Sequence, residues 1–204
     1  MNRFGRTQGR TASLLSSGEK VVIVAFGDSI TAGYAVRRGF PYFWREALAR
    51  KYPSARIELH NEGVSGDTSF DGLARLGWSV LPHRPDLVTM NFGINDAAYG
   101  ISIEEFSSNL VEMAERIQAE CGSEVILLSS QPLLTAGFND LVLRYYNALE
   151  AVAKEMGLGY VDVYGAWMEC AEAGVPLESL ILSGLDHPNE AGYRIIAEAL
   201  MKLF

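Results

Sequence analysis

The chain has 204 residues, of which 49% are hydrophobic, and its formal net charge is −8. This length predicts one domain with a substantial core, and the acidic balance argues against a nucleic-acid partner, because phosphate binding rests on clustered Lys and Arg. The cysteines, Cys121 and Cys170, stand far apart without a neighbouring Cys or His, which argues against a zinc site or a disulfide framework and favours reduced thiols in a cytoplasmic protein.

The N-terminal residues 1–18 are basic and rich in Ser, Gly and Thr. Their apolar patch is too short for the core of a signal peptide, and no run long enough to cross a membrane follows. We therefore expect a flexible or loosely docked arm over residues 1–18, a single domain over residues 19–204, no stable membrane insertion and a cytoplasmic location.

Beyond this arm, short apolar runs alternate with longer amphipathic segments, a pattern typical of βα units around a parallel sheet. The predicted strands are Lys20–Phe26, Arg56–His60, Asp86–Phe92, Glu124–Ser130 and Tyr160–Val163, the second polar enough for an edge. The predicted helices are Pro41–Arg50, Ile103–Glu120, Asn139–Met156 and Glu190–Leu203. With right-handed crossovers, these elements predict an α/β/α sandwich of three layers around a mostly parallel sheet of about five strands.

Four polar clusters follow these predicted elements: Gly27–Gly33 (GDSITAG), Asn61–Thr68 (NEGVSGDT), Gly93–Asp96 (GIND) and Asp186–Asn189 (DHPN). Ligands of parallel sheets bind outside the carboxyl ends of the strands. We therefore expect the four clusters to line one cleft. The segment Gln131–Phe138 follows another strand, so we expect it to approach the same cleft. It could contact the acyl chain or sugar face of a substrate, or it could simply pack on the body of the protein.

The clusters contain the groups that acyl transfer requires, namely a nucleophile, a base and donors for an oxyanion. Ser29 lies on a sharp turn after a strand, Gly66 has no side chain to block its N–H, and Asn95 carries an amide donor. Each signal alone has an ordinary interpretation as a turn, a helix cap or a loop histidine, including His187. Their combination in this order is harder to explain by turn chemistry.

In these four blocks the chain resembles the GDSL or SGNH hydrolase family, over a region from about Val21 to the final helix. GDSI matches the serine block through Ser29, SGDT the glycine block through Gly66, GIND the asparagine block through Asn95, and HPN the histidine block through His187. The resemblance implies an esterase-like or lipase-like hydrolase with a flavodoxin-like sheet and no metal or organic cofactor.

The resemblance also implies a role for each matched residue. Ser29 would form an acyl-enzyme, with His187 as its general base and then as general acid for the departing alcohol. The N–H groups of Ser29 and Gly66 and the Asn95 amide would form the oxyanion hole. For Asp28 and Asp96 we expect a supporting role, as acceptors that hold the loops of their neighbours.

The histidine block departs from the family pattern, which usually reads DxxH. Here Gly184 occupies the aspartate position, and the nearby carboxylate is Asp186, directly before His187. Asp186 is a tentative third catalytic member, although adjacent side chains of an extended segment point in opposite directions. A carbonyl of Ser183 or Gly184 could instead hold the Nδ1–H group, which we favour slightly, or a carboxylate from elsewhere could do so.

The leading hypothesis is a serine hydrolase of a small or medium acyl ester, like an esterase or lysophospholipase. A carbohydrate O-deacetylase of the same family is the alternative. A non-catalytic, flavodoxin-like binding module is a third hypothesis, but Asp28 beside Ser29 would repel an anionic ligand there. The expected partner is therefore a small ester, and the sequence leaves the oligomeric state open.

Overall fold

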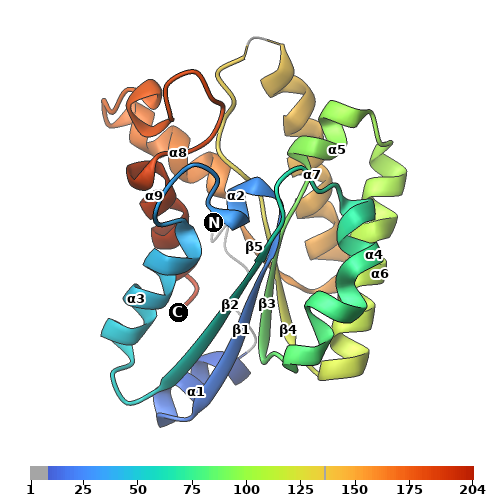
Figure 1. Cartoon of the computed structure of the whole chain (residues 1–204), viewed down its shortest axis with the longest axis vertical. Coiled ribbons are helices and arrows are strands. Elements are labelled where there is room, and N and C mark those ends of the chain that lie inside the picture. The colour runs from blue at the N-terminus through green and yellow to red at the C-terminus, as the bar shows by residue number, and fades with distance from the viewer. Residues whose placement is uncertain (1–8, 136) are drawn as a thin grey trace.

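The structure, a computed structural model, describes residues 9–135 and 137–204. Its centre is a five-stranded sheet with the strand order β2-β1-β3-β4-β5, in which every neighbouring pair is parallel (Figure 1). The strands are β1 (Lys20–Gly27), β2 (Arg56–Gly63), β3 (Leu87–Asn91), β4 (Glu124–Leu128) and β5 (Gly159–Val161). The predicted sheet is confirmed, and β2 is an edge strand as expected.

The strand order places a topological switch point at β1. The chain leaves β1 for β2 on one side and later returns to β3 on the other side of β1. In open parallel sheets the crevice for a ligand lies at such a point, outside the carboxyl ends of the strands. The position for a site is therefore next to the residues that follow β1, β2 and β3.

Helices cover both faces of the sheet, as Figure 1 shows, with α3, α8 and α9 on one side and α4, α6 and α7 on the other. The helices that follow β1 are α2 (Ser29–Ala32), α3 (Phe40–Lys51), α4 (Ser69–Ser79), α5 (Ile94–Tyr99), α6 (Ile103–Cys121), α7 (Phe138–Met156), α8 (Val163–Glu172) and α9 (Glu190–Met201), with short 3₁₀ turns at Leu81–His83 and Leu177–Leu180. This confirms the three layers. The helices α3, α6, α7 and α9 lie within a few residues of the predicted bounds, whereas α2, α4, α5 and α8 have no predicted counterpart.

Each face of the sheet has its own apolar core, and β1 contributes to both. Alternate side chains of a strand point to opposite faces, so Val24 and Phe26 pack toward one helix layer while Ile23 and Ala25 pack toward the other. The first core includes Phe106, Met113 and Leu149, and the second includes Trp44, Trp167 and Tyr193. Burial on both faces makes β1 a fixed support for whatever follows it.

The N-terminal segment differs from the expected arm. Arg10–Ser17 forms a helix, α1, whose Leu15 side chain is buried in the second core. The Glu124 carboxylate accepts hydrogen bonds from the main-chain N–H groups of Arg10 and Thr11, which satisfies donors that a helix start leaves unpaired. The rest of the expected arm, residues 1–8, lies outside the described residues.

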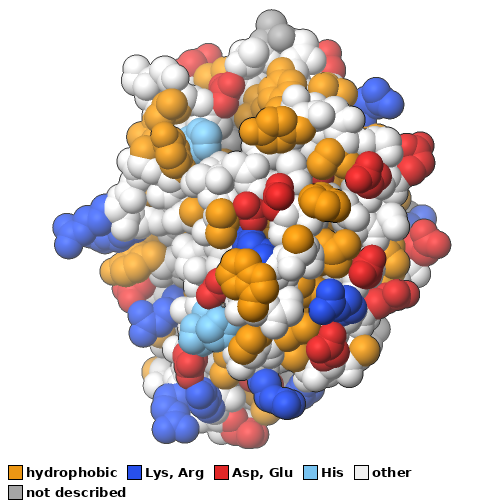
Figure 2. Space-filling model, turned by 45° about the vertical axis from the view of Figure 1, so that its right-hand side comes forward, with side chains coloured by type: hydrophobic (Ala, Val, Ile, Leu, Met, Phe, Trp, Pro, Cys, Tyr) orange, Lys and Arg blue, Asp and Glu red, His pale blue; other side chains and the backbone are white. Residues whose placement is uncertain are grey.

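The surface in Figure 2 shows hydrophobic side chains interspersed with acidic and basic ones. The largest exposed apolar side chains are scattered along the chain and include Tyr34, Phe70, Trp78, Tyr99, Leu134 and Leu185. Among the residues that the structure describes, no helix combines the length and the apolar character needed to cross a membrane.

Glycine at position 72 allows α4 to approach the sheet closely. A Cβ atom at Gly72 would lie 2.6 Å from Cζ of Phe92, whose ring is buried directly after β3. Gly77, on the same helix, has only the end of the Arg116 side chain near its Cβ position, at 3.7 Å. A side chain at position 72 would therefore clash with Phe92, whereas position 77 has room for one.

We expect Gly72→Ala to lower the free energy of unfolding by about 1–3 kcal/mol, because overpacking outweighs the better helix propensity of alanine. Gly77→Ala is the matched control and should raise the same free energy by up to about 1 kcal/mol. Urea unfolding of both variants measures the difference. Equal stabilisation by the two substitutions would contradict this account of how α4 packs.

Candidate active site

The structure brings Ser29 and His187 into direct contact. Ser29 begins α2 immediately after β1, and its Oγ lies 2.8 Å from Nε2 of His187, a residue 158 positions away in the sequence. Both side chains are half-buried. This is the geometry in which an imidazole can accept the hydroxyl proton, provided that the other ring nitrogen, Nδ1, carries a proton of its own.

Asp28 holds the turn on which Ser29 lies. Its Oδ1 accepts a hydrogen bond of 2.9 Å from the main-chain N–H of Ile30, and its own N–H donates to the Asn91 carbonyl. The carboxyl group is buried, and this burial raises its pKa to about 7, although the bond from Ile30 acts in the opposite direction. Asp28 thus makes contacts with the turn of the nucleophile and with the last residue of β3.

The loop after β2 lies against the turn of the nucleophile. A Cβ atom at Gly63, the last residue of β2, would overlap the main chain of Thr31 and Ala32 in α2. Gly66, further along this loop, is exposed and has a φ of +91°, a conformation that glycine adopts without the strain of a side chain. The loop can therefore present its N–H groups beside Ser29.

Asn95 connects this loop to the segment that follows β3. Its Nδ2 donates a hydrogen bond of 2.8 Å to the main-chain carbonyl of Asp67. An amide nitrogen carries two N–H donors, so one remains for a ligand. The Asp67 contact fixes the direction of that second donor.

Asp96, the next residue, is fully buried and holds the start of α4. Its carboxylate accepts from the Ser69 main-chain N–H at 3.0 and 3.2 Å and from the Ser69 hydroxyl at 2.6 Å. Burial raises the pKa of Asp96, and the bonds from Ser69 partly offset this effect. Asp96 therefore joins the segment of the asparagine block to the start of α4, which follows the glycine block.

Several hydrogen bonds fix the loop that carries His187. The His187 carbonyl accepts from the Leu182 N–H at 2.9 Å. Asp186 accepts twice: its carbonyl from Gln131 Nε2 at 3.0 Å and its Oδ2 from the Thr135 hydroxyl at 2.7 Å. The segment Gln131–Phe138 thus reaches the loop of the histidine, as its position after β4 predicts.

The Nδ1 atom of His187 is buried and has no hydrogen-bond partner among the described residues. None of the three acceptors considered for it therefore holds the ring here: the Asp186 carboxylate binds Thr135 instead, and no carbonyl of Ser183 or Gly184 reaches Nδ1. The ring does lie against Tyr34, with 4.8 Å between the ring centroids. Burial lowers the pKa of His187 below its ordinary value of 6.5, and the charge of Asp186 raises it in part.

A hollow of about 490 Å³ adjoins the histidine loop. Its lining residues are Leu134, Thr135, Glu178 and the run 181–186. Leu134 and Leu185 are each 41% exposed, so this hollow presents apolar side chains next to Asp186. Within the described part of the chain, no group of three or more His, Cys, Asp or Glu side chains is arranged to hold a metal ion.

Sequence reasoning did not identify Tyr34 or Arg75 as residues of this region. Tyr34 follows the nucleophile turn and contacts the His187 ring. Arg75 lies on α4, which was not predicted, although the Thr68–Asp71 pair forms a capping box at its start. That pair, followed by apolar residues at helical spacing, is the signal from which the helix could have been found.

Comparison with known proteins gives matches over most of the chain. Residues 25–195 match the model of the GDSL-like Lipase/Acylhydrolase family. Esterase TesA of Pseudomonas aeruginosa is 33% identical over 136 residues, which cover 65% of this chain and 66% of that protein. An arylesterase of Vibrio mimicus is 32% identical over 55% of this chain and 54% of its own length. The chain thus matches about half to two thirds of these two relatives.

Longer matches have lower identity. An acetylxylan esterase of Geobacillus stearothermophilus is 24% identical over 92% of this chain and 94% of its own length. Its crystal structure has a TM-score of 0.79 to this fold, covering 90% of this chain and 93% of that one at 22% identity. The family match over residues 25–195 shows that the chain belongs to the GDSL-like Lipase/Acylhydrolase family.

Proposed function

We propose that the protein is a serine ester hydrolase that acts through an acyl-enzyme on Ser29. In the first step, the Ser29 Oγ attacks the ester carbonyl carbon while its proton passes to Nε2 of His187. The carbonyl oxygen becomes an oxyanion, which accepts hydrogen bonds from the N–H groups of Ser29 and Gly66 and from the second N–H of Asn95. The C–O bond to the alcohol then breaks, and His187 donates its proton to the leaving oxygen.

The second half of the reaction repeats these roles with water. His187 accepts a proton from a water molecule, whose oxygen attacks the acyl carbon of the Ser29 ester. Collapse of this second tetrahedral species breaks the acyl–Oγ bond and returns the proton from His187 to Ser29. The products are a carboxylic acid and an alcohol, so atoms and charge balance without a cofactor.

The observation that carries this proposal is the distance of 2.8 Å between Ser29 Oγ and His187 Nε2, at the edge of the sheet where Gly66 and Asn95 also lie. The esterase names of the relatives support the same reaction class. A non-catalytic binding module would leave the contact between Ser29 and His187 without a role. A cytoplasmic location stays a prediction, and one relative, of Bacillus subtilis, is named a lipoprotein.

For the substrate we propose an ester with a small or medium acyl chain. Support for a longer acyl group comes from Leu134 and Leu185, which line the hollow of about 490 Å³ beside the loop of His187. Ser29 and His187 themselves are not among its lining residues. The competing candidate is a carbohydrate O-deacetylase, which the relation to the acetylxylan esterase of Geobacillus stearothermophilus supports. The two candidates share every step above and differ in the group that the cleft accommodates.

The reaction class is tested by covalent labelling. A fluorophosphonate probe should label the protein at Ser29, because the probe reacts with a serine hydroxyl that an adjacent base activates. Ser29→Ala should abolish labelling and hydrolysis of aryl esters. Ser108→Ala, which removes an exposed serine of α6, is the control and should keep both. Equal labelling of the Ser29→Ala variant and the unmodified protein would refute the proposal.

Acyl length separates the two substrate candidates. With aryl acetate, butanoate and hexanoate esters, kcat/KM should rise with chain length, because each buried methylene contributes about 0.8 kcal/mol. Acetylated xylose, assayed in parallel, should be the poorer substrate. The reverse order, with acetyl esters and acetylated xylose preferred, would favour the deacetylase.

Substitution of Asp186 tests whether it is a third catalytic member. Because its carboxylate binds Thr135 rather than His187, we expect Asp186→Asn to lower kcat by about tenfold. Loss of a true triad aspartate costs about 10⁴ in kcat. Thr135→Val removes the same hydrogen bond from the other side and should have a similar effect. A thousandfold loss in Asp186→Asn with an unchanged melting temperature would identify Asp186 as the partner of His187.

The same substitution should change the titration of His187. The negative charge of Asp186 raises the pKa of the imidazole, so its removal in Asp186→Asn should lower that pKa further. Since the base acts in its neutral form, the variant should keep kcat/KM to a lower pH than the unmodified protein does. Proton NMR of the imidazole, assigned with His187→Ala, measures the pKa directly. A pKa that rises in the variant would contradict this sign.

A further inference from the structure

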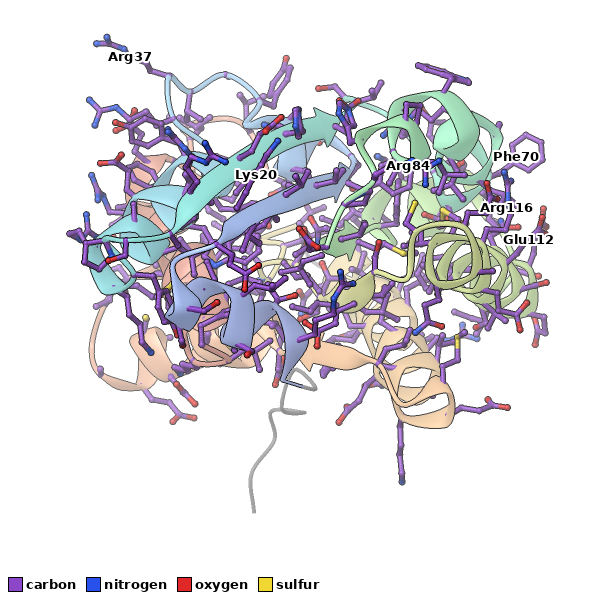
Figure 3. The ribbon with its side chains drawn as sticks, turned by 90° about the horizontal axis from the view of Figure 1, so that it is seen from below. Lys20, Arg37, Phe70, Arg84, Glu112 and Arg116 are labelled. Atoms are coloured by element: carbon purple, nitrogen blue, oxygen red, sulfur yellow. The ribbon has the colours of Figure 1, made fainter. Side chains whose placement is uncertain are left out.

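Arg75 is a buried arginine on the side of α4 that faces the sheet. Its exposure is 5%, whereas Phe70, on the same helix, is 59% exposed. Figure 3 shows Phe70 pointing outward at the periphery of the molecule. The two faces of α4 thus have different environments, and the arginine lies on the inner one.

Hydrogen bonds fix the guanidinium group of Arg75 through all three of its nitrogen atoms. Its Nε donates to Oδ2 of Asp67 at 2.6 Å, and its Nη2 donates to the carbonyls of Gly27 at 3.0 Å and Glu62 at 2.9 Å. Its Nη1 donates to the Ser79 hydroxyl at 3.1 Å, and its Cζ lies 4.5 Å from the centre of the Phe26 ring. The planar fork of five N–H donors is the feature of arginine that such a set of acceptors requires.

Three of the acceptors, Gly27, Glu62 and Asp67, belong to segments that lead to proposed oxyanion donors, whereas Ser79 lies on α4 itself. Gly27 ends β1 and precedes the turn of Ser29, while Glu62 lies in β2, which leads into the loop of Gly66. Asp67 directly follows Gly66. The carbonyl of Asp67 also accepts the hydrogen bond from Asn95 Nδ2. One guanidinium therefore connects the three segments whose donors must converge on one oxygen atom.

Stability alone does not account for a charge at this position. A buried ion pair is often no more stabilising than well-packed apolar side chains of the same volume, because desolvation offsets the attraction between the charges. What the pair adds is a fixed relative position for the segments that it joins. This matters for catalysis, because a misplacement of about 1 Å at a reacting centre can cost a factor of about 10² in rate.

We propose that Arg75, together with Asp67, is a positioning residue that fixes the oxyanion hole. It holds the end of β1, the loop after β2 and, through the Asp67 carbonyl, the Asn95 amide in one arrangement. It contacts the main chain of these segments and not the substrate. This inference rests on the proposed function of Ser29, Gly66 and Asn95.

Kinetics of Arg75→Met test the proposal, with Arg10→Met as the matched control. Arg10 also donates to a carbonyl, that of Gly122, and to a carboxylate, that of Asp86, but at the opposite end of the sheet. We expect Arg75→Met to lower kcat by about 10², by the same factor for every acyl length, with KM changed less than about threefold. Arg10→Met should leave kcat unchanged. Equal kcat values for the two variants would overturn the proposal.

A second readout separates positioning from a loss of folded protein. An alkyl boronic acid adds to the Ser29 oxygen to give a tetrahedral adduct, whose oxygen occupies the oxyanion hole and resembles the transition state. Its affinity should fall in Arg75→Met by the same factor as kcat/KM, while binding of the product acid changes little. If boronate affinity is unchanged although kcat falls, Arg75 does not act on the oxyanion hole, and the proposal is wrong.

Two milder variants keep the test decisive where Arg75→Met does not fold. Arg75→Lys retains the charge but has no planar fork, and Asp67→Asn retains the carbonyl that binds Asn95 while losing its negative charge. Each should lower kcat and boronate affinity in parallel, by about tenfold, and unchanged values in both folded variants would overturn the proposal.

Labelling of Ser29 by the fluorophosphonate probe tests the reaction class separately. Absence of labelling in the unmodified protein would refute the proposed function, whereas labelling with unchanged kinetics in these variants would refute only the role of Arg75.

Discussion

The hydrogen bond between Ser29 Oγ and His187 Nε2 joins the end of β1 to the loop before α9, and the arrangement of the whole site depends on it. Its two sides are supported differently. On the serine side, β1 is buried on both faces, so the turn after it has a rigid base. On the histidine side, Asn189 caps α9 by accepting from the N–H groups of Ala191 and Gly192, and Tyr193 and Ile196 of that helix are buried. The contact therefore joins two anchored elements.

Much of this arrangement could be predicted from the sequence, because it follows from the spacing of apolar residues and from the positions of the polar clusters along the chain. Runs such as Lys20–Phe26 and Glu124–Ser130 are apolar without alternation, which indicates strands covered on both faces. In a parallel sheet, every polar cluster that follows such a strand lies at the same edge. This reasoning places Ser29, Gly66 and Asn95 together without any knowledge of side-chain contacts, and the structure has β1, β2 and β3 ending side by side.

The remaining features depend on contacts between residues distant in sequence or on side-chain directions. α1 is held in place by hydrogen bonds to Glu124, which lies 114 positions from Arg10. The sequence of this segment alone therefore indicates only a polar arm. α2 and α5 are too short for helical periodicity to show, and α4 contains two glycines, of which Gly72 is required by the close approach to Phe92. The direction of the Asp186 carboxylate could not be predicted from the sequence either. It depends on Thr135, a residue of a different loop.

The environment of His187 also indicates where the proposed mechanism must obtain its transition-state stabilisation. Burial lowers the pKa of the imidazole, which favours the neutral form that accepts the Ser29 proton. The same burial disfavours the imidazolium ion that forms when the proton arrives, and no acceptor at Nδ1 among the described residues offsets this cost. In the usual triad, a hydrogen-bonded carboxylate stabilises that ion. Here a larger share of the transition-state stabilisation must therefore come from the hydrogen bonds to the oxyanion. The placement of its donors then matters more than it does beside a full triad, and the segments that carry those donors meet at the buried Arg75.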